Sequence, residues 1–194
     1  MNSPLILASN SPRRRELLEQ IGLSFTIDPA DVDEQILTGE TPEDYAVRVA
    51  RDKARIAAQR SGRGIVIAAD TIVVLGREVL GKPSDHEDAA RMLTLLSGRE
   101  HRVITGLIVM DAATGRATAR IVTTKVWFRA LRTSEIHAYV ATGEPMDKAG
   151  AYGIQEKGAL LVDRIEGCYF NVVGLPLSVL GEILEAFNIR PLGT

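Results

Sequence analysis

The sequence predicts an α/β fold with a mixed sheet and flanking helices. Short apolar segments of strand type alternate with segments of helical periodicity along the 194-residue chain. Their order, β-α-β-α-β-β-α-β-β-α-β-β-α, is typical of α/β domains. With 45% hydrophobic and 25% charged residues, the chain suits one globular domain, either undivided or built of two small lobes that share a core. No repeat, low-complexity tract or long linker marks a boundary.

The predicted strands are short apolar runs bounded by turn residues. They are expected at residues 5–8, 24–28, 64–69, 72–75, 78–80, 101–110 and 118–128. The run 64–69 has the composition of a strand buried on both faces. Residues 72–75 and 78–80 form a predicted hairpin, and a later hairpin is expected to turn at Glu166-Gly167.

The predicted helices are marked by capping residues. Ser11 and Thr41 each precede a proline, which is favoured at the first helical position. Ser84 and Glu87 have the spacing of a capping box. The helices are expected at about residues 12–21, 42–60, 85–97, 134–142 and 177–187, with a glycine-rich loop over 143–153.

Charge and cysteine content exclude several classes of protein. The chain has 23 Lys and Arg against 25 Asp and Glu, a formal net charge of −2. It therefore lacks the basic field that drives binding to nucleic acid, and any anion site must be local. The single cysteine, Cys168, excludes an internal disulfide and any zinc site with two or more thiolates. A reducing cytoplasm suits this composition.

The sequence shows neither a secretory signal nor a membrane-spanning segment. Its arginines follow the apolar residues, which reverses the order of a secretory signal, so we expect a mature start. The longest apolar stretch, 64–76, is interrupted by Asp70 and is shorter than the roughly 20 residues of a membrane span. We expect a soluble protein with no membrane partner.

An anion site is predicted where the first strand meets the first helix. Ser9 and Ser11 precede the cations Arg13, Arg14 and Arg15. Positive charge in the first turn opposes the helix dipole by about 0.3–1 kcal/mol per group, and a bound phosphate would remove that conflict. The alternative is an exposed helix with solvated arginines. The segment is not a Walker A loop, because the chain lacks the glycine and lysine pattern that defines such a loop.

Carboxylates supply a candidate metal site. Asp70 comes at the predicted end of a buried strand, where ligands of open α/β sheets bind. The alternative is a capped turn around Asp70. Asp28, Asp31, Asp33 and Glu34 lie close together in sequence, and one of them with Asp70 would suffice for Mg²⁺ or Mn²⁺. Taken alone, this acidic segment has the pattern of a solvated loop.

Two lysines and a glycine-rich loop complete the candidates. Lys82 precedes a proline that stiffens its approach, and Lys53 has the pattern of a solvated helix residue. The loop 147–155 lets backbone approach a ligand, and Gln155 offers a donor and an acceptor to a base edge.

Histidine and cysteine chemistry is not indicated. The three histidines, His86, His101 and His137, have no metal-binding or triad spacing. Cys168 has no histidine positioned near it in sequence, so it is expected to be a small buried or turn residue rather than a nucleophile.

Several ordered motifs resemble the Maf family over nearly the whole chain, from Leu5 to about Phe187. They are Ser9-Asn10-Ser11-Pro12-Arg13-Arg14, Glu34, Ala50-Arg51-Asp52-Lys53-Ala54, Ala69-Asp70-Thr71, Gly81-Lys82-Pro83, Gly143-Glu144-Pro145, residues 148–155 and residues 173–177. The resemblance implies the Maf/Ham1-like (ITPase-like) fold, a twisted mixed sheet with flanking helices and a central cleft. It also implies a single domain, 1–194, with two lobes around that cleft.

The resemblance further implies a metal-dependent nucleoside triphosphate pyrophosphatase that cleaves between the α and β phosphates. Asp70 matches the catalytic acid/base position, and Glu34 matches an acidic position tied to metal and catalysis, with Asp33 as a one-residue alternative. The phosphate-site positions are matched by Ser9, Arg13, Arg14, Lys53 and Lys82. The specificity positions of the dTTP/UTP branch are matched by Arg13, Thr71 and Gln155. The partner that the resemblance implies is a nucleoside triphosphate. The resemblance is compatible with a homodimer as well as with a monomer.

Two other functions compete with this hypothesis. One is a nucleotide-binding regulator of septum formation without turnover, which would share the pocket. The other is a phosphoprotein- or RNA-binding module using Arg13 to Arg15, which the acidic charge and scarce aromatic residues disfavour.

Overall fold

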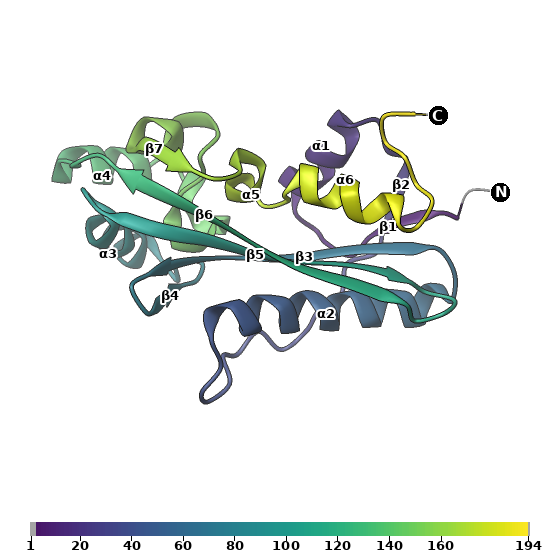
Figure 1. Cartoon of the computed structure of the whole chain (residues 1–194). Coiled ribbons are helices and arrows are strands. Elements are labelled where there is room, and N and C mark those ends of the chain that lie inside the picture. The colour runs from purple at the N-terminus through teal and green to yellow at the C-terminus, as the bar shows by residue number, and fades with distance from the viewer. Residues whose placement is uncertain (1–2, 194) are drawn as a thin grey trace. The chain divides into compact units, whose positions relative to one another are not determined.

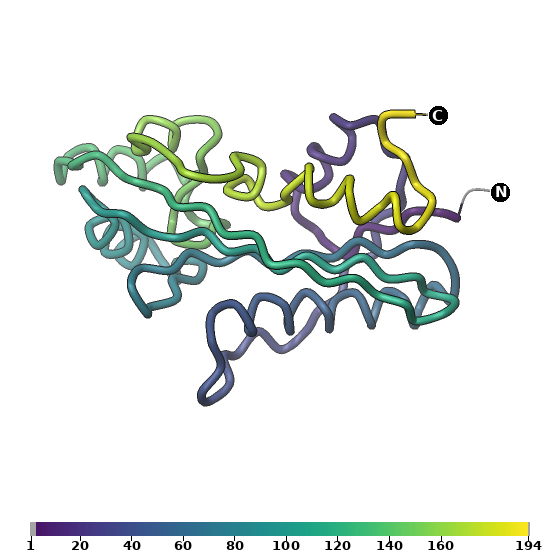
Figure 2. Tube along the Cα trace, in the orientation of Figure 1, coloured from purple at the N-terminus to yellow at the C-terminus, as the bar shows by residue number. Residues whose placement is uncertain are grey.

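The computed structural model describes residues 3–193 and has the expected mixture of helices and strands (Figures 1 and 2). The strands are β1 (Leu5–Leu7), β2 (Phe25–Ile27), β3 (Ile65–Leu75), β4 (Glu78–Leu80), β5 (Glu100–Asp111), β6 (Ala117–Phe128) and β7 (Val162–Glu166). The α-helices are α1 (Pro12–Gln20), α2 (Pro42–Ser61), α3 (His86–Leu96), α4 (Thr133–Val140), α5 (Tyr169–Val173) and α6 (Leu177–Glu185). Three 3₁₀ helices, η1 (Glu144–Asp147), η2 (Ala149–Ala151) and η3 (Glu156–Leu161), lie between α4 and β7.

The strands form one mixed sheet in the order β2-β1-β3-β5-β6-β7, with β4 paired to β3. Strand β1 runs parallel to both β2 and β3, whereas β4 is antiparallel to β3 and β7 is antiparallel to β6. This arrangement confirms the predicted α/β class with a mixed sheet. Within residues 3–193, none of the helices has both the length and the apolarity that a membrane span requires.

The chain divides into two compact units, and the division falls within the long strands β3, β5 and β6. Unit 1 comprises residues 1–70, 105–122 and 174–194, and unit 2 comprises residues 71–104 and 123–173. Each unit is described separately below.

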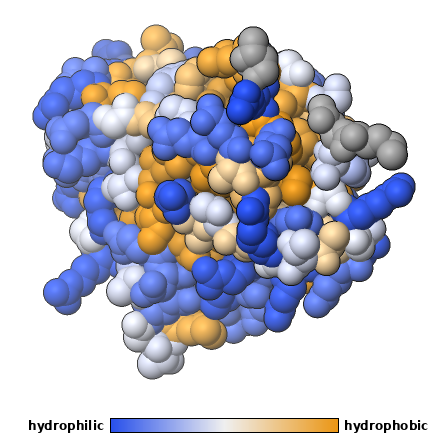
Figure 3. Space-filling view, turned by 45° about the vertical axis from the view of Figure 1, so that its right-hand side comes forward, coloured by the Kyte–Doolittle hydropathy of each residue, from blue (hydrophilic) through white to orange (hydrophobic). Residues whose placement is uncertain are grey.

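In unit 1, helix α2 packs closely against one face of the strands, and α1 and α6 lie on the other face (Figure 1). The cluster beneath α2 consists of Ile6, Ala8, Ala50, Ala54, Ala57, Ala58, Val66, Ala68 and Ile108. Alanine on the helix and Gly106 on β5 permit this close approach, because a Cβ on Gly106 would lie 2.4 Å from the Ala46 carbonyl oxygen. The outward residues of α2 include Arg51, Arg55 and Gln59, and the lower part of the face in Figure 3 is mostly hydrophilic.

In unit 2, larger side chains form the core. Leu93 and Leu96 of α3, Phe128 of β6 and Tyr152 after η2 belong to one buried cluster. Gly150 allows η2 to approach β3, because its φ is +68° and any Cβ would lie 2.9 Å from the Val73 side chain. The residues expected to form one irregular loop, 143–153, therefore contain two short 3₁₀ helices against the core.

Strand β3 is longer than predicted. It continues from Ile65 to Leu75 without a break, so Asp70 lies in the middle of a strand and not at its carboxyl end. The residues after Asp70 are Thr71, Ile72, Val73 and Val74, and β-branched side chains favour extended backbone. The prediction that the strand ends in a carboxylate is therefore wrong.

Two other local predictions are also corrected. The helix α3 is capped by Asp85, which accepts from the Asp88 N–H, and not by the expected pair Ser84 and Glu87. Asp88 in turn accepts from the Ser84 N–H, so this first-turn carboxylate bonds to the residue before the N-cap.

The expected hairpin at Glu166-Gly167 contains only its first strand, β7. The Thr124 hydroxyl accepts from the Cys168 N–H and donates to the Cys168 carbonyl, both at 3.1 Å. These are the backbone groups that a second strand would pair, and the chain turns into α5 instead.

Candidate functional site

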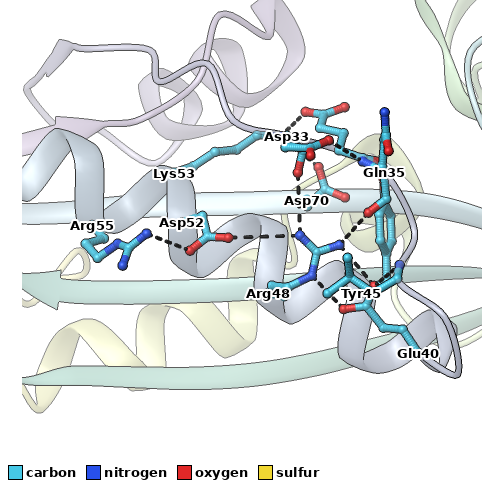
Figure 4. A network of polar contacts seen from close by, with 11 residues as sticks. Asp33, Gln35, Glu40, Tyr45, Arg48, Asp52, Lys53, Arg55 and Asp70 are labelled. Atoms are coloured by element: carbon cyan, nitrogen blue, oxygen red, sulfur yellow. Dashed lines mark hydrogen bonds and ion pairs between the residues drawn. The ribbon is translucent and has the colours of Figure 1, made fainter.

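A lysine ammonium joins two carboxylates in unit 1. The Lys53 Nζ atom lies 2.8 Å from Asp70 Oδ1 and 2.7 Å from Glu34 Oε1. Lys53 comes from α2, Asp70 from β3 and Glu34 from the loop of residues 28–41 between β2 and α2; Figure 4 labels Lys53 and Asp70. We call these three residues the Lys53 cluster. The expectation that Lys53 is a solvated helix residue is wrong, because its side chain is only 12% exposed.

Burial strengthens the interactions inside the cluster. Asp70 is 8% exposed as a residue, and a charge at such a position must be paired or hydrogen-bonded. The partner of Asp70 is Lys53 and not the backbone of a turn, so the capped-turn alternative fails. The Glu34 side chain is 51% exposed, so the cluster opens to solvent on the Glu34 side.

Arg14 is a half-buried cation of unit 1. Its Nε donates to the Gly174 carbonyl at 2.9 Å, and its Nη1 donates to Ser9 Oγ at 3.1 Å. Burial lowers the pKa of the Arg14 guanidinium, while the negative charge of Asp70 acts in the opposite direction. Arg14 is therefore an inward-facing cation that is electrostatically coupled to the Lys53 cluster, and not a solvated arginine.

The start of α1 has the features of an anion site. Ser11 is the N-cap and accepts from the Arg14 N–H, as predicted, while the Ser11 N–H donates to Ser9 Oγ at 3.2 Å. The first turn of α1 contains no acidic residue, whereas α2 and α3 each carry two acidic residues there. Arg13 is half-buried beside these groups. The positive end of a helix dipole and neighbouring guanidinium donors suit a phosphate.

The remaining predicted site residues belong to unit 2. Thr71 follows Asp70 on β3 and is half-buried, and Lys82 is exposed just after β4. Gln155 is half-buried at the start of η3. The Gly150 N–H donates to the Gly81 carbonyl at 3.0 Å, which ties the glycine-rich loop to the segment that carries Lys82.

Comparison with known proteins decides the family. The family model described as Maf-like protein matches residues 4–187. The chain belongs to the Maf family. It is 54% identical over 186 residues to a protein of Geotalea uraniireducens (strain Rf4) named dTTP/UTP pyrophosphatase, covering 96% of this chain and 94% of the relative. It is 52% identical over 192 residues to a protein of the same name from Geobacter metallireducens, covering 99% and 97%.

Solved structures agree on the fold of this Maf chain. A HAM1 protein from Coxiella burnetii matches with a TM-score of 0.55 at 18% identity, covering 96% of this chain and 100% of that protein. The Staphylococcus aureus Ham1 protein matches with a TM-score of 0.54 at 17% identity, covering 95% and 99%. The predicted Maf/Ham1-like fold is thus confirmed.

The donor set of the Maf chain suits a hard cation. Within residues 3–193, no group of three or more His, Cys, Asp or Glu side chains is arranged to bind a metal ion. Glu34 and Asp70, however, converge on one cation, the Lys53 ammonium. Mg²⁺ commonly takes one or two carboxylates and completes its shell with water and substrate phosphates. Two carboxylates that already meet at a positive charge fit that requirement.

His101 and Cys168 have structural environments. His101 is 1% exposed, and its Nε2 lies 2.7 Å from the Tyr152 hydroxyl. Burial lowers the pKa of His101 to about 4 and raises the pKa of the Tyr152 hydroxyl. Cys168 is half-buried, with its backbone bound to Thr124.

Tyr45 and Arg48 of α2 were not anticipated from the sequence. Both donate hydrogen bonds to the loop that carries Glu34. The spacing of eight residues between Tyr45 and Lys53, which places them on one side of a helix, was the available signal.

Proposed function

We propose that this Maf protein hydrolyses dTTP and UTP between the α and β phosphates and releases the nucleoside monophosphate and pyrophosphate. The observation that carries the proposal is the Lys53 cluster, with the half-buried Arg14 electrostatically coupled to it. Such a set of carboxylates and cations suits phosphoryl transfer, which depends on positioning and charge neutralisation more than on a protein nucleophile. Relatives about half identical over nearly their full length carry the name dTTP/UTP pyrophosphatase.

Glu34 and Asp70 would hold the divalent cation, Mg²⁺ or Mn²⁺. When bound, the cation would neutralise phosphate charge and polarise the bond that breaks. Asp70 accepts the proton of the attacking water as general base. Lys53 lies next to both carboxylates and offers its positive charge to the neighbouring phosphate oxygens.

The phosphates are bound by the start of α1 and by two further cations. Ser9, Arg13 and Arg14 donate hydrogen bonds to phosphate oxygens at the helix N-terminus. Lys82 neutralises charge on pyrophosphate as it leaves. We infer no covalent intermediate, because water can attack phosphorus directly.

Base selection is assigned to Gln155, and Thr71 and Arg13 are the other two positions that match the specificity residues of the dTTP/UTP branch. Uracil and thymine present the same N3–H donor and O4 acceptor, which one carboxamide can pair with two hydrogen bonds. In a panel of the eight common nucleoside triphosphates, Gln155→Ala should lose the preference of UTP over CTP. An unchanged preference would show that Gln155 does not contact the base.

The proposal is tested by product analysis with Asp70→Asn. Wild-type protein with Mg²⁺ should convert dTTP to dTMP and pyrophosphate in equal amounts, measured by ion-exchange chromatography. Asp70→Asn should lower kcat by about 10²–10⁴, because the amide cannot accept the proton, while nucleotide binding persists. Asp163→Asn, which changes an exposed carboxylate on β7, is the matched control.

Two results would reject the proposal. Nucleotide binding without any pyrophosphate release would favour the regulator that lacks turnover. Full kcat in Asp70→Asn would remove Asp70 from the chemistry.

A further inference from the structure

Glu34 lies in a loop that would be mobile without additional support. Residues 28–41 contain neither helix nor strand, and nearly all of them are exposed or half-buried. Loops of this length are uncommon in compact domains unless they are functional. Even so, the exposed Glu34 carboxylate reaches the buried Lys53 ammonium at 2.7 Å. The backbone of this loop must therefore be held in place.

Three consecutive carbonyl groups of the loop accept hydrogen bonds from two side chains of α2 (Figure 4). The Tyr45 hydroxyl donates to the Glu34 carbonyl at 2.9 Å. The Arg48 Nη2 atom donates to the Gln35 carbonyl at 2.8 Å, and Nη1 donates to the Asp33 carbonyl at 3.5 Å. The backbone on both sides of Glu34 is thereby fixed to the helix that carries Lys53.

Arg48 is itself held by a two-point ion pair with Glu40. Its Nε lies 2.6 Å from Glu40 Oε1, and its Nη2 lies 3.0 Å from Oε2. The same carboxylate accepts from the Leu37 N–H at 3.0 Å, so it also fixes the end of the loop. The hydrogen bonds lower the pKa of Glu40 and raise that of Arg48, so both remain charged.

We propose that Tyr45 and Arg48 are positioning residues that hold Glu34 in place as a cation ligand beside Asp70. We call these two side chains the α2 clamp. The inference rests on the proposed function, because it takes Glu34 to bind the divalent cation. Groups that orient a metal ligand commonly change metal affinity or activity by about 10–100-fold when removed. At residues 33–35 the clamp bonds to backbone carbonyls and not to the Glu34 side chain, so its effect on a bound cation would pass through the position of the Glu34 carboxylate.

The test measures direct binding of Mn²⁺ to the protein in the absence of nucleotide. Electron paramagnetic resonance of the ion reports the bound fraction. Tyr45→Phe removes one hydroxyl and keeps the ring, and Arg48→Lys keeps the charge but loses the planar fork. Each should raise the dissociation constant for Mn²⁺ by about 10-fold or more. Arg55→Lys is the matched control on the same helix, since Arg55 is 63% exposed and pairs with Asp52; it should bind Mn²⁺ as the wild type does.

A second measurement separates positioning from a general loss of structure. Amide hydrogen exchange should accelerate over residues 33–37 in both clamp variants and stay unchanged in α1. In a Glu34→Gln background, Tyr45→Phe should weaken Mn²⁺ binding no further, because the clamp acts through the Glu34 side chain.

The outcomes distinguish the two proposals. If Glu34→Gln weakens Mn²⁺ binding and both clamp variants bind as the wild type does, the clamp inference is wrong and the metal assignment survives. If clamp variants weaken binding equally with and without Glu34, positioning is also rejected. If neither Glu34→Gln nor Asp70→Asn changes Mn²⁺ binding, or the wild type binds none, the metal assignment fails and the inference fails with it.

Discussion

The Lys53 Nζ atom donates a hydrogen bond to Asp70 Oδ1 at 2.8 Å and so connects the middle of α2 to the middle of β3. Both side chains are nearly buried, at 12% and 11% exposure. In such a pair the attraction between the charges offsets the loss of hydration, and removal of one partner leaves the other charge uncompensated. This pair is thus important for stability as well as for the proposed chemistry.

Lys53→Met should therefore destabilise unit 1, since Asp70 would keep a buried charge without its partner. We expect the free energy of unfolding to fall by about 3 kcal/mol, as for other broken buried pairs. Urea denaturation at pH 7.5 measures the change. Lys125→Met, which breaks a half-exposed pair with Glu166 at 3.7 Å, is the control and should cost less than about 1 kcal/mol.

The double variant Lys53→Met/Asp70→Asn tests whether the unpaired Asp70 charge causes the loss of stability in Lys53→Met. Neutralising Asp70 should restore part of the stability that Lys53→Met removes, because the unpaired charge is gone. Strictly additive losses would contradict the ion-pair explanation.

The fold class was accessible from sequence because the helix caps and strand runs are local signals. Ser11 and Thr41 cap α1 and α2 as predicted. Where two local signals competed, as at Ser84 and Asp85, the prediction missed the cap by one residue. The continuation of β3 through Asp70 was missed because a charged residue normally ends an apolar run, and the partner that neutralises it, Lys53, is remote in sequence.

The candidate site was only partly accessible for the same reason. Residue type and motif singled out Glu34, Lys53 and Asp70, but no local pattern indicates that they meet at one ammonium. Tyr45 and Arg48 donate to backbone carbonyl groups. Every residue has such a group, so the residue types of the loop do not indicate which of them accepts these hydrogen bonds.

Arg14→Lys should weaken substrate use although it preserves the charge. The guanidinium donates to Gly174 and Ser9 at the same time, which a single ammonium at the end of a flexible chain cannot reproduce. Loss of one such charged hydrogen bond corresponds to about 1.5–3 kcal/mol, or roughly a 10–150-fold fall in kcat/KM for dTTP. Arg15→Lys, at a 49% exposed position, should retain kcat/KM. Equal values for the two variants would show that the fork of Arg14 is dispensable.

Gly106→Ala should destabilise the contact between α2 and β5. The new methyl group would lie 2.4 Å from the Ala46 carbonyl oxygen, so the helix must shift, and overpacking of this kind costs about 1–3 kcal/mol. Gly181→Ala in α6 is the matched control, because nothing lies within 4 Å of its added Cβ. That variant should gain about 0.4–1 kcal/mol through the unfolded chain. Thermal unfolding measures both, and a stable Gly106→Ala would disprove the close approach.

The buried histidine predicts a specific dependence of stability on pH. His101 packs edge-to-face against Phe128 and Tyr152, with ring centroids 5.0 and 5.4 Å apart. Burial lowers its pKa from 6.5 to about 4, and the Arg99 backbone opposes this only in part. Between these two pH values the unfolded chain binds a proton that the folded protein excludes, so lower pH favours unfolding.

The contribution of His101 should therefore be complete above about pH 6.5 and should decline as the pH falls towards about 4, by about 3 kcal/mol in total. His101→Gln keeps an acceptor for the Tyr152 hydroxyl but does not titrate, so its free energy of unfolding should fall less steeply over this range. Carboxylates titrate in both proteins, and the difference between their urea-denaturation curves at pH 7, 6, 5 and 4.5 isolates the histidine. His137→Gln, at an exposed position on α4, should keep the wild-type slope. Parallel profiles for wild type and His101→Gln would mean that His101 binds its proton equally well in the folded and unfolded chains, because only a difference in proton binding between the two states produces a slope.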